Sequence, residues 1–302
     1  MEQCVLALGF FDGVHLGHGG LLRRARQRAD ALGCAAACVT FDRHPAGLVR
    51  GAAPQLLNTA RERTELMTQR YGIDWVFVLP FDEKLRQESW ESFAGRMQKD
   101  YGACHMICGH DFRFGKGGLG DAQKLADFCA REKLGFDCIE KICLEGVTVS
   151  STHIRSLLEA GKTAEAVRFL GHGHYLSGKV IDGRKVGRTL GVPTANLQPA
   201  EGILLPKSGV YAAQARVEGE ETLYPAVVNI GCRPTFGGEN ITVEPWLLDF
   251  NGDLYGRELQ LRLWDYLRPE RKFSTPMELK AEILRNADQT LEILRALPPQ
   301  EK

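Results

Sequence analysis

The feature that most constrains the fold of this chain is a glycine-rich turn at residues 9–18, which joins an apolar run to a helical pattern. The run before it, Val5–Leu8, is short and apolar, which is typical of a buried strand. After the turn, apolar residues recur at helical spacing from Leu21 to Leu32, and Gly33 stands where a helix would end. The sequence therefore predicts a strand that passes through a tight turn directly into a helix.

Two histidines, His15 and His18, lie in this turn with Gly17 between them. The unpaired N–H groups and the dipole at the start of a helix favour an anion such as phosphate. Gly17 lets a ligand approach the backbone closely. Two imidazoles that face a phosphate can donate hydrogen bonds to a phosphorus centre that gains charge. The turn therefore predicts a phosphate-binding catalytic site rather than a surface loop with incidental histidines.

The rest of the N-terminal half alternates between strand and helix patterns. Strands are expected at residues 35–41, 75–79 and 105–109, and helices at residues 56–71 and 90–101. Such alternation predicts an α/β domain of Rossmann-like type, with a parallel sheet and helices on both faces. Ligands of such sheets bind at the carboxyl ends of the strands. Each polar motif of this half follows an expected strand, which favours one shared binding edge.

A second motif, at residues 150–155, combines hydroxyl side chains with an arginine. Ser151 and Thr152 are good caps for a helix that we expect to begin at Ile154. Arg155, in the first turn, opposes the helix dipole and can bind an oxyanion through two hydrogen bonds. An ordinary capped helix has a similar pattern, but a phosphate between the helix start and Arg155 accounts for the cation as well.

The pattern changes near residue 172, where a helix that ends at residue 171 gives way to short alternating strands and glycine turns. Many short strands predict a small closed antiparallel β-barrel. From Pro276, apolar residues follow helical spacing and predict a terminal helix. We therefore expect two domains, residues 1–171 and 172–302. His172 and His174 lie in a glycine linker and are expected to be solvated.

A glycine loop follows the first strand of the second half. There is no Walker P-loop in the chain, so a kinase here would be of another kind. Regularly spaced glycines with cations between them can form a phosphate cradle from backbone N–H groups. Thr194 and Asn196 supply uncharged oxygens, which suit a Mg²⁺ ion that bridges phosphates. The loop residues in question are Gly183, Gly187, Arg188, Gly191, Thr194 and Asn196.

The composition excludes several classes of function. Lys and Arg together number 38, as do Asp and Glu, so no net charge favours nucleic acid or an anionic membrane. The start has no basic and apolar leader, and no apolar run approaches membrane-spanning length. Nine cysteines scattered through apolar segments suit reduced thiols better than a disulfide framework. We expect a cytoplasmic monomer or weak oligomer without nucleic-acid or membrane partners.

Four strings resemble the motifs of one family. The string GFFDGVHLGHGGLL, with its HxGH turn of the nucleotidyltransferase superfamily, is similar to the N-terminal motif of the prokaryotic bifunctional riboflavin kinase/FMN adenylyltransferases. The strings at residues 109–115 and 150–155 resemble that family's GxDFRFG and SSTxIR motifs. The string GRTLGVPTANL, at residues 187–197, resembles its riboflavin kinase motif. The resemblance covers nearly the whole chain.

The resemblance implies that the barrel phosphorylates riboflavin with MgATP and that the first domain adenylylates FMN to FAD. It implies His15, His18 and Glu244 as catalytic residues, with Glu244 as the base for the riboflavin 5′-hydroxyl. In the first domain it implies ATP contacts from Gly9, Phe11, Asp12, Gly17, Ser151, Thr152 and Arg155, and flavin contacts from His44, Pro45, Asp111 and Arg113. In the barrel it implies ATP contacts from the six residues of the glycine loop.

The chain departs from the family at Gly118, where an arginine is usual, and at Trp246, where a histidine is common. Pro245, between Glu244 and Trp246, predicts an edge strand or a bulge. Two alternatives stay open. One is a nucleotidyltransferase with another acceptor and a degenerate barrel, against which the PTAN string of the barrel argues. The other is a non-catalytic flavin-binding regulator, against which the phosphate-facing residues in both halves argue.

Overall fold

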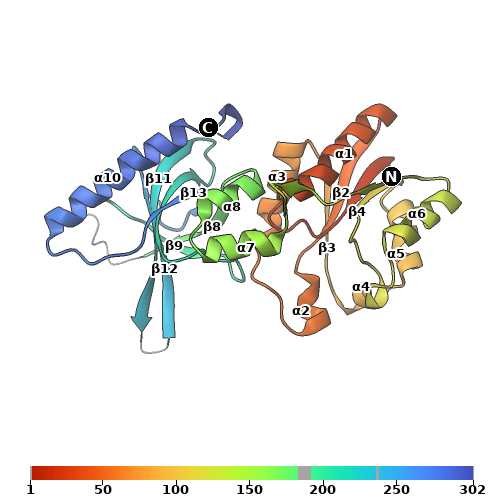
Figure 1. Cartoon of the computed structure of the whole chain (residues 1–302), viewed down its shortest axis with the longest axis horizontal. Coiled ribbons are helices and arrows are strands. Elements are labelled where there is room, and N and C mark those ends of the chain that lie inside the picture. The colour runs from red at the N-terminus through yellow and green to blue at the C-terminus, as the bar shows by residue number, and fades with distance from the viewer. Residues whose placement is uncertain (1, 183–191, 236–237, 302) are drawn as a thin grey trace. The chain divides into compact units, whose positions relative to one another are not determined.

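The computed structural model describes residues 2–182, 192–235 and 238–301 (Figure 1). Its contacts divide the chain into two compact units, Met1–Ser151 and Thr152–Lys302. Each unit has a sheet and an apolar core of its own. Among the helices of the described part, none is long and apolar enough to cross a membrane.

The first unit is built on a five-stranded sheet with the strand order β3-β2-β1-β4-β5, and the sheet is parallel, as the alternating pattern predicts. The chain runs outward from β1 through β2 to β3, and then returns to the other side of β1 with β4 and β5. Ligands of such sheets bind beyond the carboxyl ends of the strands where the order reverses, here β1 and β4. The strands span Cys4–Leu8 (β1), Ala35–Phe41 (β2), Trp75–Leu79 (β3), Ala103–Gly109 (β4) and Gly135–Ile139 (β5).

Helices cover both faces of this sheet. Helix α1 packs with α3, and α5 packs with α6 on the opposite face (Figure 1). All residues of β1 are buried, which agrees with a strand covered on both sides. The helices span Leu16–Leu32 (α1), Pro45–Arg50 (α2), Ala60–Tyr71 (α3), Glu83–Gln87 (α4), Trp90–Lys99 (α5) and Ala122–Arg131 (α6). Shorter elements are Lys116–Gly118 (η1), Cys143–Leu144 (β6) and Val147–Thr148 (β7).

Two helices begin at residues other than those that the sequence predicts. Helix α3 begins at Ala60 rather than at residue 56, because Thr59 and Glu62 form a reciprocal capping box there. Helix α7 begins at Ser151 rather than at Ile154. Apolar periodicity locates a helix, but it does not fix the first turn to within three or four residues.

The second unit is a closed barrel with the strand order β10-β11-β12-β9-β8-β13, and every pair of neighbours is antiparallel, as predicted. Strand β12 pairs on both sides and keeps a continuous register with β11 through Pro245, so the expected edge or bulge is absent. The strands span His174–Ile181 (β8), Asn196–Pro199 (β9), Gly209–Val217 (β10), Leu223–Thr235 (β11), Gly238–Leu247 (β12) and Glu258–Arg268 (β13).

Helices pack on two sides of the barrel. Helix α8 contacts β8 and β13, and α10 contacts β10, β11 and β13. Ala287 and Leu291 of α10 pack against Val227 and Leu248, so the predicted apolar stripe of α10 covers the barrel. The helices span Ser151–Glu159 (α7), Thr163–Leu170 (α8) and Pro276–Arg295 (α10), followed by a short turn at Pro299–Glu301 (η2).

The expectation that His172 and His174 are solvated is wrong, because both side chains are buried. Strand β8 begins at His174, which pairs with Leu263 of β13, so this segment is part of the barrel rather than a linker. Burial lowers the pKa of His174 to about 4. Gly171 and Gly173 suggested a flexible linker, but in the structure they lie in the closely packed segment that leads into β8.

Candidate functional site

The turn between β1 and α1 holds three residues in the left-handed backbone region. These are Phe11 at φ 58°, Gly13 at φ 82° and Val14 at φ 40°. A positive φ is strained for a bulky or β-branched residue. Phe11 and Val14 are fully buried, so packing maintains this conformation. Backbone strain of this kind is concentrated at binding and catalytic sites.

Three backbone and side-chain hydrogen bonds fix this turn from distant parts of the sequence. The Asp12 carboxylate accepts from the backbone N–H of Leu57 at 2.9 Å. The backbone N–H of Gly13 donates to the side-chain oxygen of Asn58 at 3.2 Å. The Ser151 hydroxyl donates to the backbone carbonyl of Asp12 at 2.9 Å. The last bond brings the start of the second predicted motif to the histidine turn.

The two histidines of the turn are held in one arrangement. His15 is the N-cap of α1, and its Nδ1 accepts from the backbone N–H of His18 at 3.2 Å. In the neutral ring this places the proton on Nε2. The His15 and His18 rings stack, with centroids 3.6 Å apart and planes 12° from parallel. A Cβ on Gly17 would lie 3.0 Å from two ring atoms of His15, so the ring position requires glycine.

His18 is neutral at pH 7 in this environment. Burial, the neighbouring His15 and the guanidinium of Arg63 lower the pKa of His18 well below its usual range. Its Nδ1 is buried and has no hydrogen-bond partner among the described residues. A neutral imidazole with an unpartnered nitrogen beside a helix start can bind a phosphate oxygen or hydroxyl.

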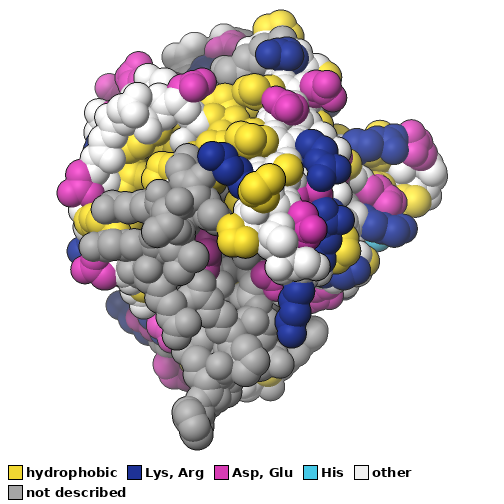
Figure 2. Space-filling model, turned by 90° about the vertical axis from the view of Figure 1, so that its left-hand side faces the viewer, with side chains coloured by type: hydrophobic (Ala, Val, Ile, Leu, Met, Phe, Trp, Pro, Cys, Tyr) yellow, Lys and Arg dark blue, Asp and Glu magenta, His cyan; other side chains and the backbone are white. Residues whose placement is uncertain are grey.

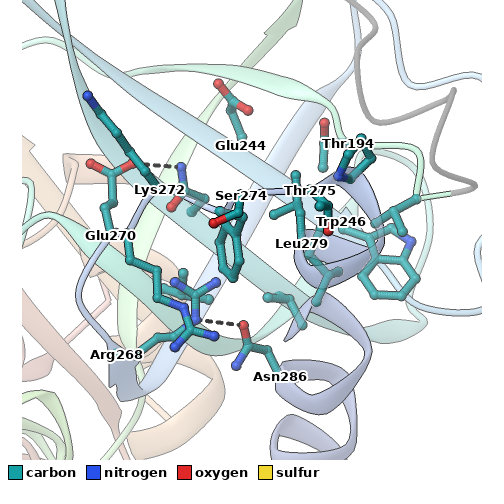
Figure 3. Close-up of a pocket in the computed structure, with 18 residues that line it drawn as sticks. Thr194, Glu244, Trp246, Arg268, Glu270, Lys272, Ser274, Thr275, Leu279 and Asn286 are labelled. Atoms are coloured by element: carbon teal, nitrogen blue, oxygen red, sulfur yellow. Dashed lines mark hydrogen bonds between the residues drawn. The ribbon is translucent and has the colours of Figure 1, made fainter. Parts of the chain in front are cut away.

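The second unit contains a pocket of about 760 Å³ between the barrel and the start of α10 (Figure 3). Asn229 of β11 and Glu244 of β12 lie directly opposite each other, and both line this pocket. Trp246 lines it as well, because alternate residues of a strand share one face. Thr194 lies on the same side of the pocket as Glu244 (Figure 3). The volume suits a small organic molecule.

Charged side chains form the opposite wall of the pocket. Arg268 lies on the side away from Glu244 (Figure 3). It shares the carboxylate of Glu282 with Arg271 and Arg285, at 3.2, 2.7 and 2.9 Å respectively. Three cations around one carboxylate leave net positive charge beside the pocket. On the face that Figure 2 shows, which is the left-hand side of Figure 1, hydrophobic side chains gather in one area with charged side chains around it.

Comparisons with known proteins match the two halves of the chain to two families of enzymes. A family model for FAD synthetase matches residues 1–153, and one for riboflavin kinase matches residues 170–294. The bifunctional riboflavin kinase/FMN adenylyltransferase of Listeria monocytogenes is 34% identical over 95% of this chain and 91% of its own length. That of Escherichia coli K12 is 37% identical over 94% of this chain and 91% of its own. The chain belongs to the bifunctional riboflavin kinase/FMN adenylyltransferase family.

A crystal structure described as a macrolide-efflux protein from Streptococcus pneumoniae matches with a TM-score of 0.84. It is 27% identical, and the match covers 98% of this chain and 95% of the streptococcal one. The description as a macrolide-efflux protein applies to the streptococcal protein and is not carried over to this chain. The likeness indicates that this member of the riboflavin kinase/FMN adenylyltransferase family shares its fold over nearly the whole length.

The structure brings part of the expected flavin contacts to the histidine turn. The His44 ring meets the ring of Phe10 edge-on, with centroids 4.8 Å apart, and its Nδ1 caps α2. Asp111 and Arg113 follow β4 at exposed positions, and Arg113 pairs with Asp121 at 3.3 Å. Among the described contacts neither of these two reaches the turn. Their flavin role, like that of Pro45, stays a prediction.

The structure describes some of the remaining residues expected to act in this family and not others. Thr152 and Arg155 follow Ser151 in α7, and their approach to the histidines stays a prediction. Asn196 opens β9, two residues after Thr194, and is not among the described pocket-lining residues. The residues Gly183, Gly187, Arg188 and Gly191 lie outside the described part of the chain.

Sequence reasoning missed two groups of residues near these sites. Arg63 and Asn58 are enclosed beside the histidine turn, although a lone arginine in a helical pattern suggests a solvated face. The run Arg268–Thr275 forms a pocket wall. The sequence did contain a sign of this pocket wall, because three cations and Phe273 precede a helix that starts with proline.

Proposed function

We propose that this chain converts riboflavin to FMN in the barrel and FMN to FAD in the parallel-sheet unit, using ATP in both reactions. The observation that carries the proposal is the presence of two separate sites in one member of this family. One is the strained histidine turn tied to Ser151, and the other is the barrel pocket with Glu244. Each has the residue types that its reaction needs.

Adenylyl transfer requires little more than positioning and charge stabilisation. The FMN phosphate attacks the α-phosphorus of ATP and pyrophosphate leaves, so no strong base is needed. His15 and His18, stacked at the start of α1, would donate hydrogen bonds to the phosphate oxygens as negative charge develops. Ser151 fixes the turn through Asp12, and Thr152 and Arg155 would hold the pyrophosphate. Loss of one such contact typically raises the barrier by about 2–4 kcal/mol.

Phosphorylation of riboflavin requires a base for a primary alcohol and a cation for the triphosphate. Glu244 would accept the proton of the 5′-hydroxyl, and Asn229 opposite it would help to orient the ribityl chain. The neutral oxygens of Thr194 and Asn196 fit Mg²⁺, which prefers oxygen ligands and would neutralise charge on the phosphates. Trp246, at a position where relatives commonly have histidine, offers a flat apolar surface to the flavin ring.

Domain limits and assembly are part of this proposal. We place the boundary between the two catalytic domains at residues 171 and 172. It is supported by Gly171, which ends α8 in the left-handed region, and by the riboflavin kinase match, which starts at residue 170, whereas the contacts of the structure divide the chain after Ser151. We expect each chain to act as a monomer or weak oligomer.

The experiment is to incubate the protein with ATP and Mg²⁺ and with either riboflavin or FMN, in separate reactions, and to separate FMN and FAD by chromatography. His18→Ala should abolish FAD formation and spare FMN formation, and Glu244→Ala should do the reverse. Equal loss of both activities in either variant would contradict two independent sites. FAD formation from FMN without any use of riboflavin would favour a degenerate barrel, and tight flavin binding without products would favour a regulator.

A further inference from the structure

Arg63 is a fully enclosed arginine of helix α3. Its Nη2 donates to the backbone carbonyl of Phe41 at 2.7 Å, and its guanidinium lies 4.5 Å from the centre of the Phe10 ring. Its Nε and Nη1 have no hydrogen-bond partner among the described residues. A guanidinium does not lose its proton in a protein, so this buried charge persists. Burial of such a charge is costly unless an anion compensates it.

The nearby carboxylates are already bonded to backbone groups. Asp12, Glu62 and Asp42 act to raise the pKa of Arg63, against the larger effect of burial, which lowers it. Asp12 accepts from the backbone N–H of Leu57. Glu62 accepts from the backbone N–H of Thr59, within the capping box of α3, and Asp42 accepts from that of Phe81. The charge of Arg63 is thus left without a hydrogen-bonded carboxylate in the described part of the chain.

Two further unpartnered nitrogens border the same turn. Asn58 is buried, its side-chain oxygen accepts from Gly13, and its Nδ2 has no described partner. The buried Nδ1 of His18 also has none among the described residues. Polar groups buried without partners are rare and costly. Several of them beside one strained turn indicate a place shaped for a ligand rich in acceptor oxygens, such as a phosphate ester.

We propose that Arg63 is a positioning residue for adenylyl transfer: its enclosed guanidinium offsets the nearby carboxylates of Asp12, Glu62 and Asp42, so that the phosphates of ATP and FMN are not repelled from the histidine turn. The proposal rests on the adenylyltransferase function proposed above. Because Arg63 is enclosed, it acts through the electric field and through His18 rather than by contact. A field of this kind is weakly screened in a protein interior. Asn58 serves the same turn by holding Gly13.

The geometry also assigns a protonation state to the site. The titratable and charged groups that act on His18 are His15, stacked on it, and Arg63, while the carboxylates of Asp12, Glu62 and Asp42 act on Arg63 in turn. The positive charge of Arg63 opposes protonation of His18. It thereby keeps His18 neutral, and its loss would let His18 take up a proton at a higher pH.

The test uses the full chain, with FAD formation from FMN and ATP as readout. Arg63→Met removes the charge and keeps the length of the side chain. The matched control is Arg96→Met, since Arg96 also lies over an aromatic ring, that of Phe93 at 5.5 Å, and is paired with Glu88 at 2.6 Å. We expect Arg63→Met to lower kcat for FAD formation about 100-fold, and Arg96→Met to leave it nearly unchanged. FMN formation by the same molecules should stay within roughly twofold of wild type.

A purely structural role predicts other results. If Arg63 acts by its charge, Arg63→Lys recovers most of the rate, and the acidic limb of the pH–rate profile moves to higher pH only in Arg63→Met. A loss in Arg63→Met no greater than in Arg96→Met would overturn the proposal, as would a folded Arg63→Lys that is as slow as Arg63→Met. If Arg63→Met does not fold, the rate and pH profile of Arg63→Lys decide, because a near-wild-type rate supports the proposal and a 100-fold loss overturns it. A wild-type chain that makes no FAD would refute the adenylyltransferase function itself.

Discussion

The substitution Gly17→Ala tests whether adenylyl transfer depends on the position of the His15 ring. Alanine is ordinarily better than glycine inside a helix, by about 0.5–1 kcal/mol. In α1, however, the new Cβ would lie 3.0 Å from Nδ1 and Cε1 of His15 and 3.4 Å from the carbonyl oxygen of Val149. The ring stacks on His18 and accepts its N–H, so a shift of a few tenths of an ångström to make room for the Cβ would weaken these contacts.

The expected result is a large loss of activity with a small change in stability. Loss of the N-cap hydrogen bond costs about 1 kcal/mol, which nearly offsets the gain in helix propensity. Displacement of a catalytic group by about 1 Å can lower the rate about 100-fold, and a shift of a few tenths of an ångström should cost less. Gly17→Ala should therefore lower FAD formation roughly tenfold, change the free energy of unfolding by less than about 1 kcal/mol, and leave FMN formation unchanged.

The assay measures both activities by chromatography of the flavins and the free energy of unfolding by urea titration. Gly95→Ala is the matched control, because a Cβ on this glycine of α5 would meet nothing within 4 Å. That variant should keep both activities and should be as stable as the wild type or slightly more so. If Gly17→Ala forms FAD at the wild-type rate, the reasoning is refuted. It is also refuted if the variant loses FMN formation to the same extent as FAD formation.

Three further predictions concern the barrel. The pKa of His174 is about 4 in the folded chain and near 6.5 in the unfolded chain, so the unfolded chain binds a proton first as the pH falls. His174 should therefore lower the free energy of unfolding by about 2 kcal/mol between pH 7 and pH 5. Urea titration should find this loss in the wild type and not in His174→Leu. Glu282→Gln leaves three arginines without their carboxylate and should raise the KM for riboflavin roughly tenfold, without a change in FAD formation from FMN. Glu292→Gln, at an exposed position of the same helix, should change neither the KM nor FAD formation. Chelation of Mg²⁺ should stop FMN formation and readdition should restore it; persistence of FMN formation in excess chelator would contradict the proposed metal role of Thr194 and Asn196.

Local pattern was enough for the elements and for much of the candidate site. The strands at Ala35–Phe41 and Trp75–Leu79 and the helix from Pro276 were predictable, because a strand inside a parallel sheet reads as a continuous apolar run and a helix buried on one face repeats apolar residues at helical spacing. The histidine turn was predictable for a similar reason. Its glycines, its histidines and the helix start lie within one short stretch, and Gly17 is required by its contact with His15.

Only the tertiary structure decided which distant residues meet. The sequence places Arg63 on a helix, but its enclosure under the end of β1 depends on how α3 docks against the sheet. His174 resembles a linker residue until β8 closes the barrel against β13. The wall formed by Arg268–Thr275 lies across the pocket from Glu244 only because the barrel closes. Periodicity records whether a residue is buried within its own element, whereas charge and hydrogen-bond partners depend on contacts across the fold, which no local pattern encodes.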